Sequence, residues 1–108
     1  MESAPEYCEP SDLELLETAR RSRGGERERA ESRLLARHQR RVYVWCYRVV
    51  RDHERALDLA QDVLLSAWRN LDGFEGRARF SSWLFALARN RCLSELRRRL
   101  ESRTGELA

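Results

Sequence analysis

The stretch RARFSSWLFALARNRCLSELRRR, residues 77–99, combines a helical pattern with aromatic rings and a high density of arginine. Its apolar residues recur at three- and four-residue spacing, as in a helix that buries one face. They are Leu84, Leu87, Ala88 and Leu96. The rings of Phe80, Trp83 and Phe85 stand among the arginines. Bases stack on rings and guanidinium groups bind phosphates, so the stretch indicates a helix that binds a nucleic-acid strand with unpaired bases.

The composition of the 108-residue chain favours an all-α fold. Gly (5) and Pro (2) are scarce, 36% of the residues are charged, and runs of alternating β-branched residues are missing. This length suits one domain with a modest core. We expect a small bundle of three main helices plus a short N-terminal helix over residues 11–101. Residues 1–10 should be a disordered acidic N-terminus and residues 102–108 a frayed C-terminus or the start of a linker.

The first two helices are predicted from a capping motif and from apolar spacing. Ser11 and Glu14 fit a capping box, and the pair Gly24–Gly25 should end the short helix that follows. A second helix is expected over residues 26–50. Its apolar stripe consists of Leu35, His38, Val42, Trp45, Cys46 and Val49.

The third and fourth helices are predicted in the same way. Asp52 is a suitable N-cap for a helix over residues 53–70. Its inward residues should be Ala56, Leu59, Ala60, Val63, Leu64, Ala67 and Trp68. Residues 71–79 contain two glycines and mixed charges, which are typical of a loop. Ser81 should cap the fourth helix, with Phe80 and Phe85 forming a hydrophobic staple.

The charge of the chain is unevenly distributed. Residues 1–17 contain six acids and no arginine, which leaves +9 on the remainder because the whole chain carries +3. A basic body suggests a polyanion-binding surface that the acidic head could partly shield, although a solvated helical surface rich in charge has the same composition. No apolar run approaches the roughly 20 residues that span a bilayer, and the N-terminus is unlike a signal peptide. We expect a cytoplasmic protein without membrane insertion.

The sequence contains no recognisable catalytic or metal-binding motif. Cys8, Cys46 and Cys92 are widely spaced, and only His38 and His53 could assist them in binding a metal. Cys46 and Cys92 are therefore expected to be small buried residues. Phosphate loops and nucleophile or zinc-protease motifs are also missing. The chain is expected to be a binding module without cofactor or metal, and not an enzyme.

Three hydrogen-bond acceptors form a compact patch on the predicted third helix. Asp58, Gln61 and Asp62 follow the spacing i, i+3 and i+4, which places them on one face opposite the apolar stripe. Such a triplet is most often solvated surface with local ion pairs. The alternative is a docking site for a basic partner.

Two motifs in order resemble region 2 of bacterial sigma factors, and specifically the small extracytoplasmic-function group. The first is DLAQDVLLSAW, residues 58–68, and the second is FSSWLFALARNRCLSELRRR, residues 80–99. A glycine-containing loop separates them, and the resemblance covers residues 34–99. Either motif alone would be weak, whereas the pair in this order is specific.

The resemblance implies a docking role for the third helix. In sigma factors the matching helix binds the coiled-coil clamp helices of the RNA polymerase β′ subunit. Asp58, Gln61 and Asp62 would be the anchors, because carboxylates and amides accept charge-assisted hydrogen bonds from arginine. Leu65 and Arg69 would lie at the rim of this contact.

The resemblance also implies that the loop and the fourth helix bind the promoter minus-ten element. The loop, residues 71–79, would hold a flipped non-template base, with Phe74 as a wall of its pocket. Trp83 would replace a lost stacking partner at the upstream edge of the bubble, and Asn90 would read the last paired base. Phe80 is a further candidate for base contact. The phosphates would be held by Arg77, Arg79, Arg89, Arg91, Arg97 and Arg98.

Structural alternatives remain for three of these residues. Trp83 could pack on the third helix, Phe80 could serve only as a staple, and Asn90 could bond locally. A rival for the whole domain is a sigma-like interaction module bound by an anti-sigma factor or another regulator, without promoter reading. A nonspecific helical nucleic-acid binder is the third alternative. Complete small sigma factors continue into region 4, and whether its absence here reflects an excised domain or the natural protein stays open.

Overall fold

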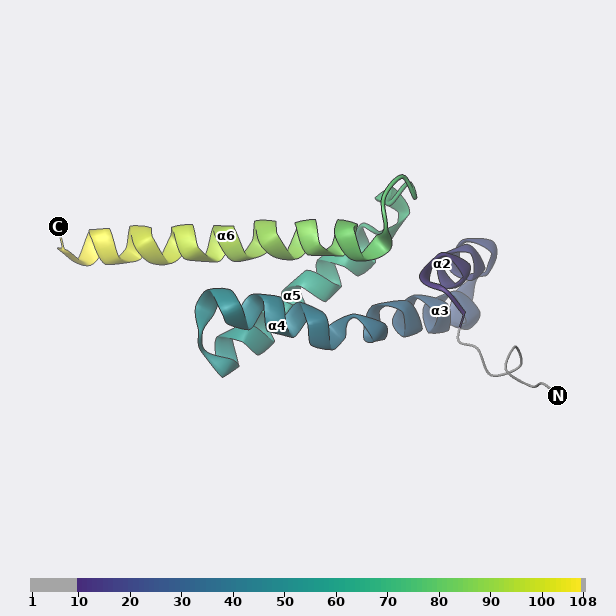
Figure 1. Ribbon diagram of the computed structural model, residues 1–108, viewed down its shortest axis with the longest axis horizontal. Helices are drawn as coiled ribbons and strands as arrows, with labels where there is room; N and C mark the ends of the chain where they lie inside the picture. The colour runs from purple at the N-terminus through teal and green to yellow at the C-terminus, as the bar shows by residue number, and fades with distance from the viewer. Residues whose placement is uncertain (1–9, 108) are drawn as a thin grey trace. The chain divides into compact units, whose positions relative to one another are not determined.

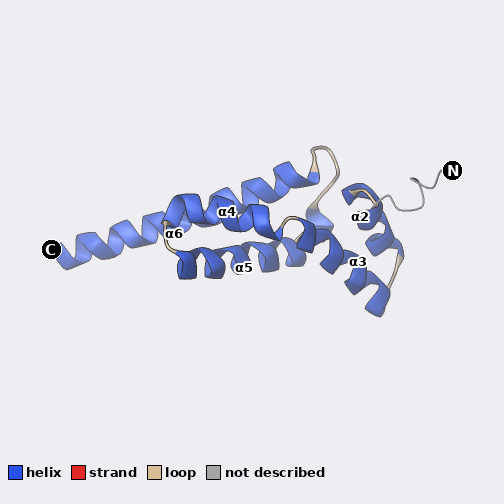
Figure 2. Ribbon diagram, turned by 60° about the horizontal axis from the view of Figure 1, so that its bottom comes forward, coloured by secondary structure: helices blue, strands red, loops and turns tan. Residues whose placement is uncertain are grey.

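The computed structural model describes residues 10–107, and every regular element within this range is helical (Figure 2). The expected all-α class is therefore confirmed. The elements are α2 (Asp12–Arg21), α3 (Gly24–Arg37), α4 (Gln39–Val50), α5 (His53–Arg69), the 3₁₀ helix η1 (Leu71–Gly73) and α6 (Phe80–Leu107). Apart from residue 10, the expected disordered N-terminus lies outside the described residues. The chain divides into two compact units, one ending at Ala36 and the other beginning at Arg37.

In the first unit, α2 begins with the predicted capping box. The Glu14 amide donates to the Ser11 hydroxyl at 3.1 Å, and the Ser11 amide donates to the Glu14 carboxylate at 2.7 Å. The helix ends at Arg21, and Gly24 and Gly25 form the first turn of α3 instead of ending α2. Gly24 has a φ of +62°, a left-handed conformation that glycine adopts without strain. The prediction that the glycine pair ends the first helix is therefore wrong.

The expected second helix is divided at His38. α3 ends at Arg37 and α4 begins at Gln39, because His38 has φ −103° and ψ 3°, outside the usual α-helical range. Its ring is buried and lies 5.4 Å from the ring of Phe80. Helix propensity is a weak preference that tertiary packing overrides, so a pattern of spacing could not place this break.

The second unit is a three-helix bundle in which each of α4, α5 and α6 contacts the other two. Figures 1 and 2 show α5 running antiparallel to both α4 and α6, and the last turns of α6 extending past the ends of the other two. The buried residues of the three helices match the predicted stripes at most positions. They are Val42, Cys46 and Val50, then Ala56, Leu59, Ala60, Val63 and Ala67, then Leu84, Ala88 and Cys92.

The predicted core fails at Trp68, whose side chain is 46% exposed. Trp68 follows the buried Ala67, and one residue turns an α-helix by roughly 100°. It therefore lies on the outer face of α5, although its spacing of four residues from Leu64 suggested the buried stripe.

The ends of α5 and α6 show where local capping predictions hold. Asp52 caps α5 as predicted, because its carboxylate accepts the Arg55 amide at 3.0 Å. Ser81 does not cap α6. The carbonyl of Arg79 accepts the Ser82 and Trp83 amides at 3.0 and 3.1 Å, and the helix starts at Phe80, two residues earlier than a cap at Ser81 would place it. At its other end α6 runs through residues 102–107, where we expected a frayed end or a linker.

Candidate functional site

The outer face of α5 carries all five residues that were expected to dock a partner. Asp58, Gln61, Asp62, Leu65 and Arg69 are exposed, and the buried residues of α5 occupy the opposite side of the helix. Two carboxylates and an amide thus project from a rigid element whose other face is anchored in the bundle. Such a face can accept several charge-assisted hydrogen bonds from a basic partner.

Sequence reasoning missed two apolar residues on this face. Leu57 is exposed, and so is Trp68, which was assigned to the core. Helical periodicity places both beside Gln61 and Leu65. The face is therefore amphipathic, with exposed apolar side chains next to acids, and apolar area beside polar groups is what an interface core with a polar rim requires. The only signal in the sequence was that Trp68 directly follows an alanine of the buried stripe.

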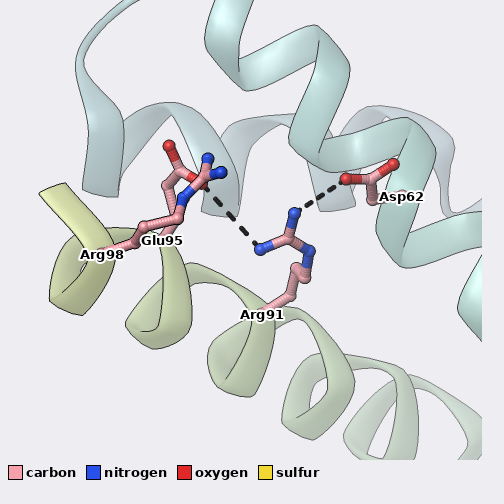
Figure 3. Close-up of polar contacts among 4 residues, drawn as sticks. All are labelled: Asp62, Arg91, Glu95 and Arg98. Carbon is pink, nitrogen blue, oxygen red and sulfur yellow. Dashed lines mark hydrogen bonds and ion pairs between the residues drawn. The ribbon is translucent and has the colours of Figure 1, made fainter.

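An ion pair joins α5 to α6 across the bundle surface (Figure 3). One guanidinium nitrogen of Arg91 donates to the Asp62 carboxylate at 2.9 Å. The other lies 4.0 Å from Glu95, which also accepts a hydrogen bond from Arg98 at 2.7 Å. Glu95 is buried, and two arginines satisfy its charge. These four residues line a groove of about 620 Å³ with Arg55, Asp58, Leu59, Arg99 and Ser102.

The aromatic residues of the loop and of the first turn of α6 form a packed cluster. Phe74 and Phe80 are buried, with ring centroids 5.5 Å apart, and Trp83 lies 5.4 Å from Phe74 and 5.5 Å from Phe80. Trp83 alone of the three is partly exposed. Phe74, expected to be a pocket wall, and Phe80, expected to contact a base, are thus interior residues that hold the loop and position Trp83. Phe85 lies against Trp45 instead, at 4.8 Å.

The predicted strand-binding residues of α6 fall on three different faces. Trp83, Asn90 and Arg97 are spaced by seven residues and form one outward stripe, with Asn90 and Arg97 exposed. Arg91 and Arg98 lie on the side that carries the ion pairs described above. Arg89 lies on the α4 side, where it lines an apolar hollow. The structure therefore brings together only part of the predicted set.

The loop before α6 places two of the predicted arginines in solvent. Arg77 and Arg79 are exposed, and Arg77 forms a surface ion pair with Glu75 at 3.2 Å. Gly76 adopts a φ of +82°, which an L side chain rarely does. A tight turn here brings Arg77 and Arg79 next to the start of α6.

A second groove lies between α4 and the first turns of α6, and the sequence analysis did not identify it. Its volume is about 750 Å³. It is lined by Arg37, Arg40, Arg41, Val44, Trp45, Arg48, Ser81, Ser82 and Phe85. No role was predicted for the arginines of α4 from the sequence. Their assembly with Phe85 depends on how α4 packs against α6.

Between α4 and α6 lie two free, buried cysteines, as predicted. Burial raises the pKa of the Cys46 thiol from 9.0 to about 12, and burial also raises the pKa of Cys92. Both thiols are therefore neutral at ordinary pH. In the described part of the chain no three His, Cys, Asp or Glu residues are grouped to hold a metal. No helix within residues 10–107 is long and apolar enough to cross a membrane.

Comparison with known proteins identifies the family. The Sigma-70 region 2 family matches residues 34–101. The ECF RNA polymerase sigma factor SigG of Mycobacterium tuberculosis is 39% identical over 63% of this chain and 19% of its own length. SigW of Bacillus subtilis, also an ECF RNA polymerase sigma factor, is 32% identical over 55% of this chain and 32% of its own. The ECF RNA polymerase sigma factor SigM of Mycobacterium tuberculosis is 36% identical over 69% of this chain and 46% of its own length.

The chain thus spans between about a fifth and just under half the length of these relatives. The match begins in the last turn of α3 and covers the whole bundle of α4, α5 and most of α6. It therefore includes the outer face of α5, the loop and the outward stripe of α6. The chain belongs to the sigma-70 family of the extracytoplasmic-function group and consists mainly of its region 2.

Proposed function

We propose that this chain acts in transcription initiation as a sigma-factor domain with two binding surfaces. The outer face of α5 binds core RNA polymerase at the clamp helices of its β′ subunit. The loop and the outward stripe of α6 bind the non-template strand of the promoter minus-ten element. The observation that carries the proposal is the separation of an acidic, partly apolar face on α5 from a stripe of Trp83, Asn90 and Arg97 on α6.

The α5 face supports polymerase binding through its chemistry. Asp58, Gln61 and Asp62 supply acceptors for arginine side chains, and Leu57 and Leu65 supply apolar area beside them. Truncating a hydrogen-bonded charge in a protein interface typically costs about 2–5 kcal/mol of binding free energy. Loss of the two carboxylates together with the amide should therefore abolish capture at micromolar concentrations.

The α6 stripe supports strand binding in a similar way. Trp83 is partly exposed and rests on the buried rings of Phe74 and Phe80, so it is held in place for stacking. Base stacking on an aromatic side chain contributes about 1–3 kcal/mol per base. The Asn90 amide has the donor and acceptor that adenine pairs with in the major groove. Arg97, seven residues further along, adds a positive charge for the phosphates.

The energetics limit what the domain does alone. Unstacking and flipping a base costs a few kcal/mol, which is about what one stacking site returns. The isolated chain should therefore capture an opened strand but not melt a duplex. Potassium permanganate should modify minus-ten thymines only when core polymerase is present. Reactive thymines with the chain alone would contradict this.

The proposal is tested first by pull-down of core polymerase. The triple variant Asp58→Ala/Gln61→Ala/Asp62→Ala should lose capture, whereas Glu26→Ala/Glu28→Ala/Gln39→Ala should retain it. The control likewise removes two carboxylates and one amide, from exposed positions of α3 and α4. Equal capture by both variants would disprove the docking surface.

Strand reading is tested with a single-stranded minus-ten oligonucleotide. Trp83→Ala/Asn90→Ala should lower its affinity at least tenfold, since each contact contributes about 1–3 kcal/mol. Trp68→Ala/Asn70→Ala removes the same residue types from exposed positions at the end of α5 and should leave the affinity unchanged. If both variants bind like the wild type, the chain is the rival interaction module that does not read promoters. A cytoplasmic location stays a prediction.

A further inference from the structure

Two thiols meet in the interior between α4 and α6, and the proposed function uses neither of them. We propose that Cys46 and Cys92 form a modification site, at which a small hydroperoxide oxidises Cys92 and Cys46 then joins it in a reversible disulfide. The disulfide links two helices of the second unit that are far apart in sequence. This inference goes beyond the proposed function, and its test needs neither polymerase nor DNA.

Each thiol occupies the middle of a buried stripe. On α4, Cys46 lies four residues from both Val42 and Val50, and on α6 Cys92 lies four residues after Ala88. The two helices contact each other, so their buried stripes share one interior. Cys46 is 0% exposed and Cys92 is 3% exposed, and both are free thiols.

The two side chains are in direct contact. Burial raises the pKa of both thiols, and a hydrogen bond between them raises the pKa of Cys46 further while it lowers that of Cys92. This is the effect expected when Cys46 donates and the sulfur of Cys92 accepts. A disulfide brings its sulfur atoms to roughly 2 Å from each other. Because the two sulfur atoms are already neighbours, a small shift of one helix is enough to form the bond.

Cys92 is the thiol that a small reagent reaches first. It lines a hollow of about 260 Å³ between α4 and α6, whereas Cys46 does not. The other lining residues are mainly apolar, and they are Trp45, Val49, Phe85, Ala88, Arg89 and Leu93. A hollow of this size admits a small hydroperoxide and excludes a protein. The reagent therefore meets Cys92 with Cys46 as its hydrogen-bonded neighbour.

The chemistry takes two steps and balances with one hydroperoxide. The Cys92 thiolate attacks the outer peroxide oxygen, the O–O bond breaks, and a sulfenic acid forms while the leaving alkoxide takes up the proton that Cys92 lost. The Cys46 sulfur then attacks the Cys92 sulfur, the S–S bond forms, and the hydroxyl group leaves as water with the Cys46 proton. Two thiols are oxidised, and the hydroperoxide is reduced to an alcohol and water.

The surroundings set the speed of this reaction. The thiolate is the reactive form, and burial keeps both thiols protonated at ordinary pH, so the site responds to sustained rather than brief oxidation. The nearby charge of Arg91 and the hydrogen bond from Cys46 both favour the thiolate of Cys92. Cys92 is therefore the attacking thiol and Cys46 the resolving one.

The experiment uses the full chain with Cys8→Ser, so that the two interior thiols are the only ones left. The chain is incubated with tert-butyl hydroperoxide, alkylated and digested with trypsin without a reductant. Trypsin cleaves after arginine, which places Cys46 in the peptide of residues 42–48 and Cys92 in that of residues 92–97. Mass spectrometry should find these two peptides linked within monomeric chains, and dithiothreitol should separate them.

Single variants test which thiol reacts first. With Cys46→Ala, dimedone should trap a sulfenic acid on Cys92, because the resolving thiol is gone. With Cys92→Ala, Cys46 should stay alkylatable and dimedone should label it far less. Circular dichroism should report the same helix content for both variants. Stronger labelling of Cys46 than of Cys92 would overturn the assignment of the two roles.

The hollow is tested as the entrance by truncating one of its walls. Leu93 lines the hollow and is 41% exposed, so Leu93→Ala should widen the entrance and speed disulfide formation severalfold. Leu100→Ala makes the same change at a residue that is 61% exposed and does not line the hollow, and it should leave the rate unchanged. Equal rates in both variants would show that the reagent does not enter there.

The oxidised chain should also be more stable, because a disulfide that closes a long loop constrains the unfolded chain. The midpoint of urea unfolding should rise by about 1–2 M and return to its original value after reduction. A midpoint that does not rise would show that the link does not fit the native packing of α4 on α6. Recovery of the two peptides unlinked after prolonged oxidation, or linked only between different chains, would overturn the inference.

Discussion

The two grooves that border α6 contain similar numbers of arginines but differ in what surrounds them. The α5–α6 groove is lined by Arg55, Arg91, Arg98 and Arg99 together with Asp58, Asp62 and Glu95. The α4–α6 groove is lined by Arg37, Arg40, Arg41 and Arg48 with serines and aromatic rings and no acid. In the first groove, Arg91 pairs with Asp62 across two helices, and Arg98 pairs with Glu95 within α6. In the second, they surround an aromatic pair.

This difference shows that counting arginines does not locate a polyanion site. Arg91 and Arg98 were expected to hold phosphates, yet their guanidinium groups lie on carboxylates. An arginine whose charge is already balanced gains less from a phosphate, because its own partner must be released first. The arginines of α4, for which nothing was predicted, form no ion pair within residues 10–107.

The largest effect on stability should come from a cavity in the buried face of α6, the helix that borders both grooves. Leu84 is fully buried on α6, and Leu84→Ala should lower the free energy of unfolding by about 2–5 kcal/mol, because it removes buried methyl groups and leaves a cavity. Urea unfolding followed by circular dichroism measures this loss. Leu13→Ala makes the same chemical change where the side chain is 56% exposed, and should cost less than about 0.5 kcal/mol. Equal costs would mean that α6 does not anchor the grooves.

The next largest effect is a loss of stability at alkaline pH, which should come from the Cys46 thiol buried between α4 and α6. Because burial raises the pKa of Cys46 to about 12, its thiol stays neutral in the folded state, while in the unfolded chain it ionises near 9.0. The contribution of this thiol to the free energy of unfolding is therefore fully present below pH 9. It falls as the pH rises toward 12, because ionisation then favours the unfolded chain. The slope contributed by one such thiol is at most about 1.4 kcal/mol per pH unit.

The Cys46→Ala variant isolates this contribution. Urea unfolding at several values between pH 8 and pH 11 should show the wild type losing stability faster than the variant above pH 9. Tyrosine ionisation affects both proteins alike and cancels in the comparison. Parallel curves would show that the thiol is not buried in the native state and that α4 does not pack on α6 as described.

The smallest effect concerns the ion pair between Arg91 and Asp62. Both side chains are more than one-third exposed, so the pair should contribute only about 0–1 kcal/mol to stability. Arg91→Gln frees the Asp62 carboxylate and should raise capture of core polymerase about two- to fivefold. It should leave the affinity for the minus-ten strand nearly unchanged, whereas Arg97→Gln on the outward stripe should lower it. A loss of strand affinity with Arg91→Gln equal to that with Arg97→Gln would restore Arg91 as a phosphate contact.

Much of the fold followed from local patterns in the sequence. The caps at Ser11 and Asp52 were predictable because a side chain and an amide three residues apart decide them. The buried stripes of α4, α5 and α6 were predictable because helical periodicity links spacing to a face. The acidic face of α5 followed from the same rule, and its residues are exposed.

What could not be predicted depended on neighbours far away in sequence. The break at His38 accompanies packing against Phe80, which lies on another helix. Phe74 had no helical face to join, and the interior that buries it forms only when the loop folds over α6. Trp68 lies on the outer face of α5, because its spacing from Leu64 did not account for the rotation that separates it from the buried Ala67.

The amino-acid sequence by itself determined most of the helical segments, most of the residues that each buries, and the two motifs that mark the family, because these features rest on residues within a few positions of one another. Only the tertiary structure decided which arginines are balanced by acids and which surround the rings of Trp45 and Phe85. The physical reason is that ion pairs and grooves form between helices. Their composition depends on which faces meet, and no single helix specifies that.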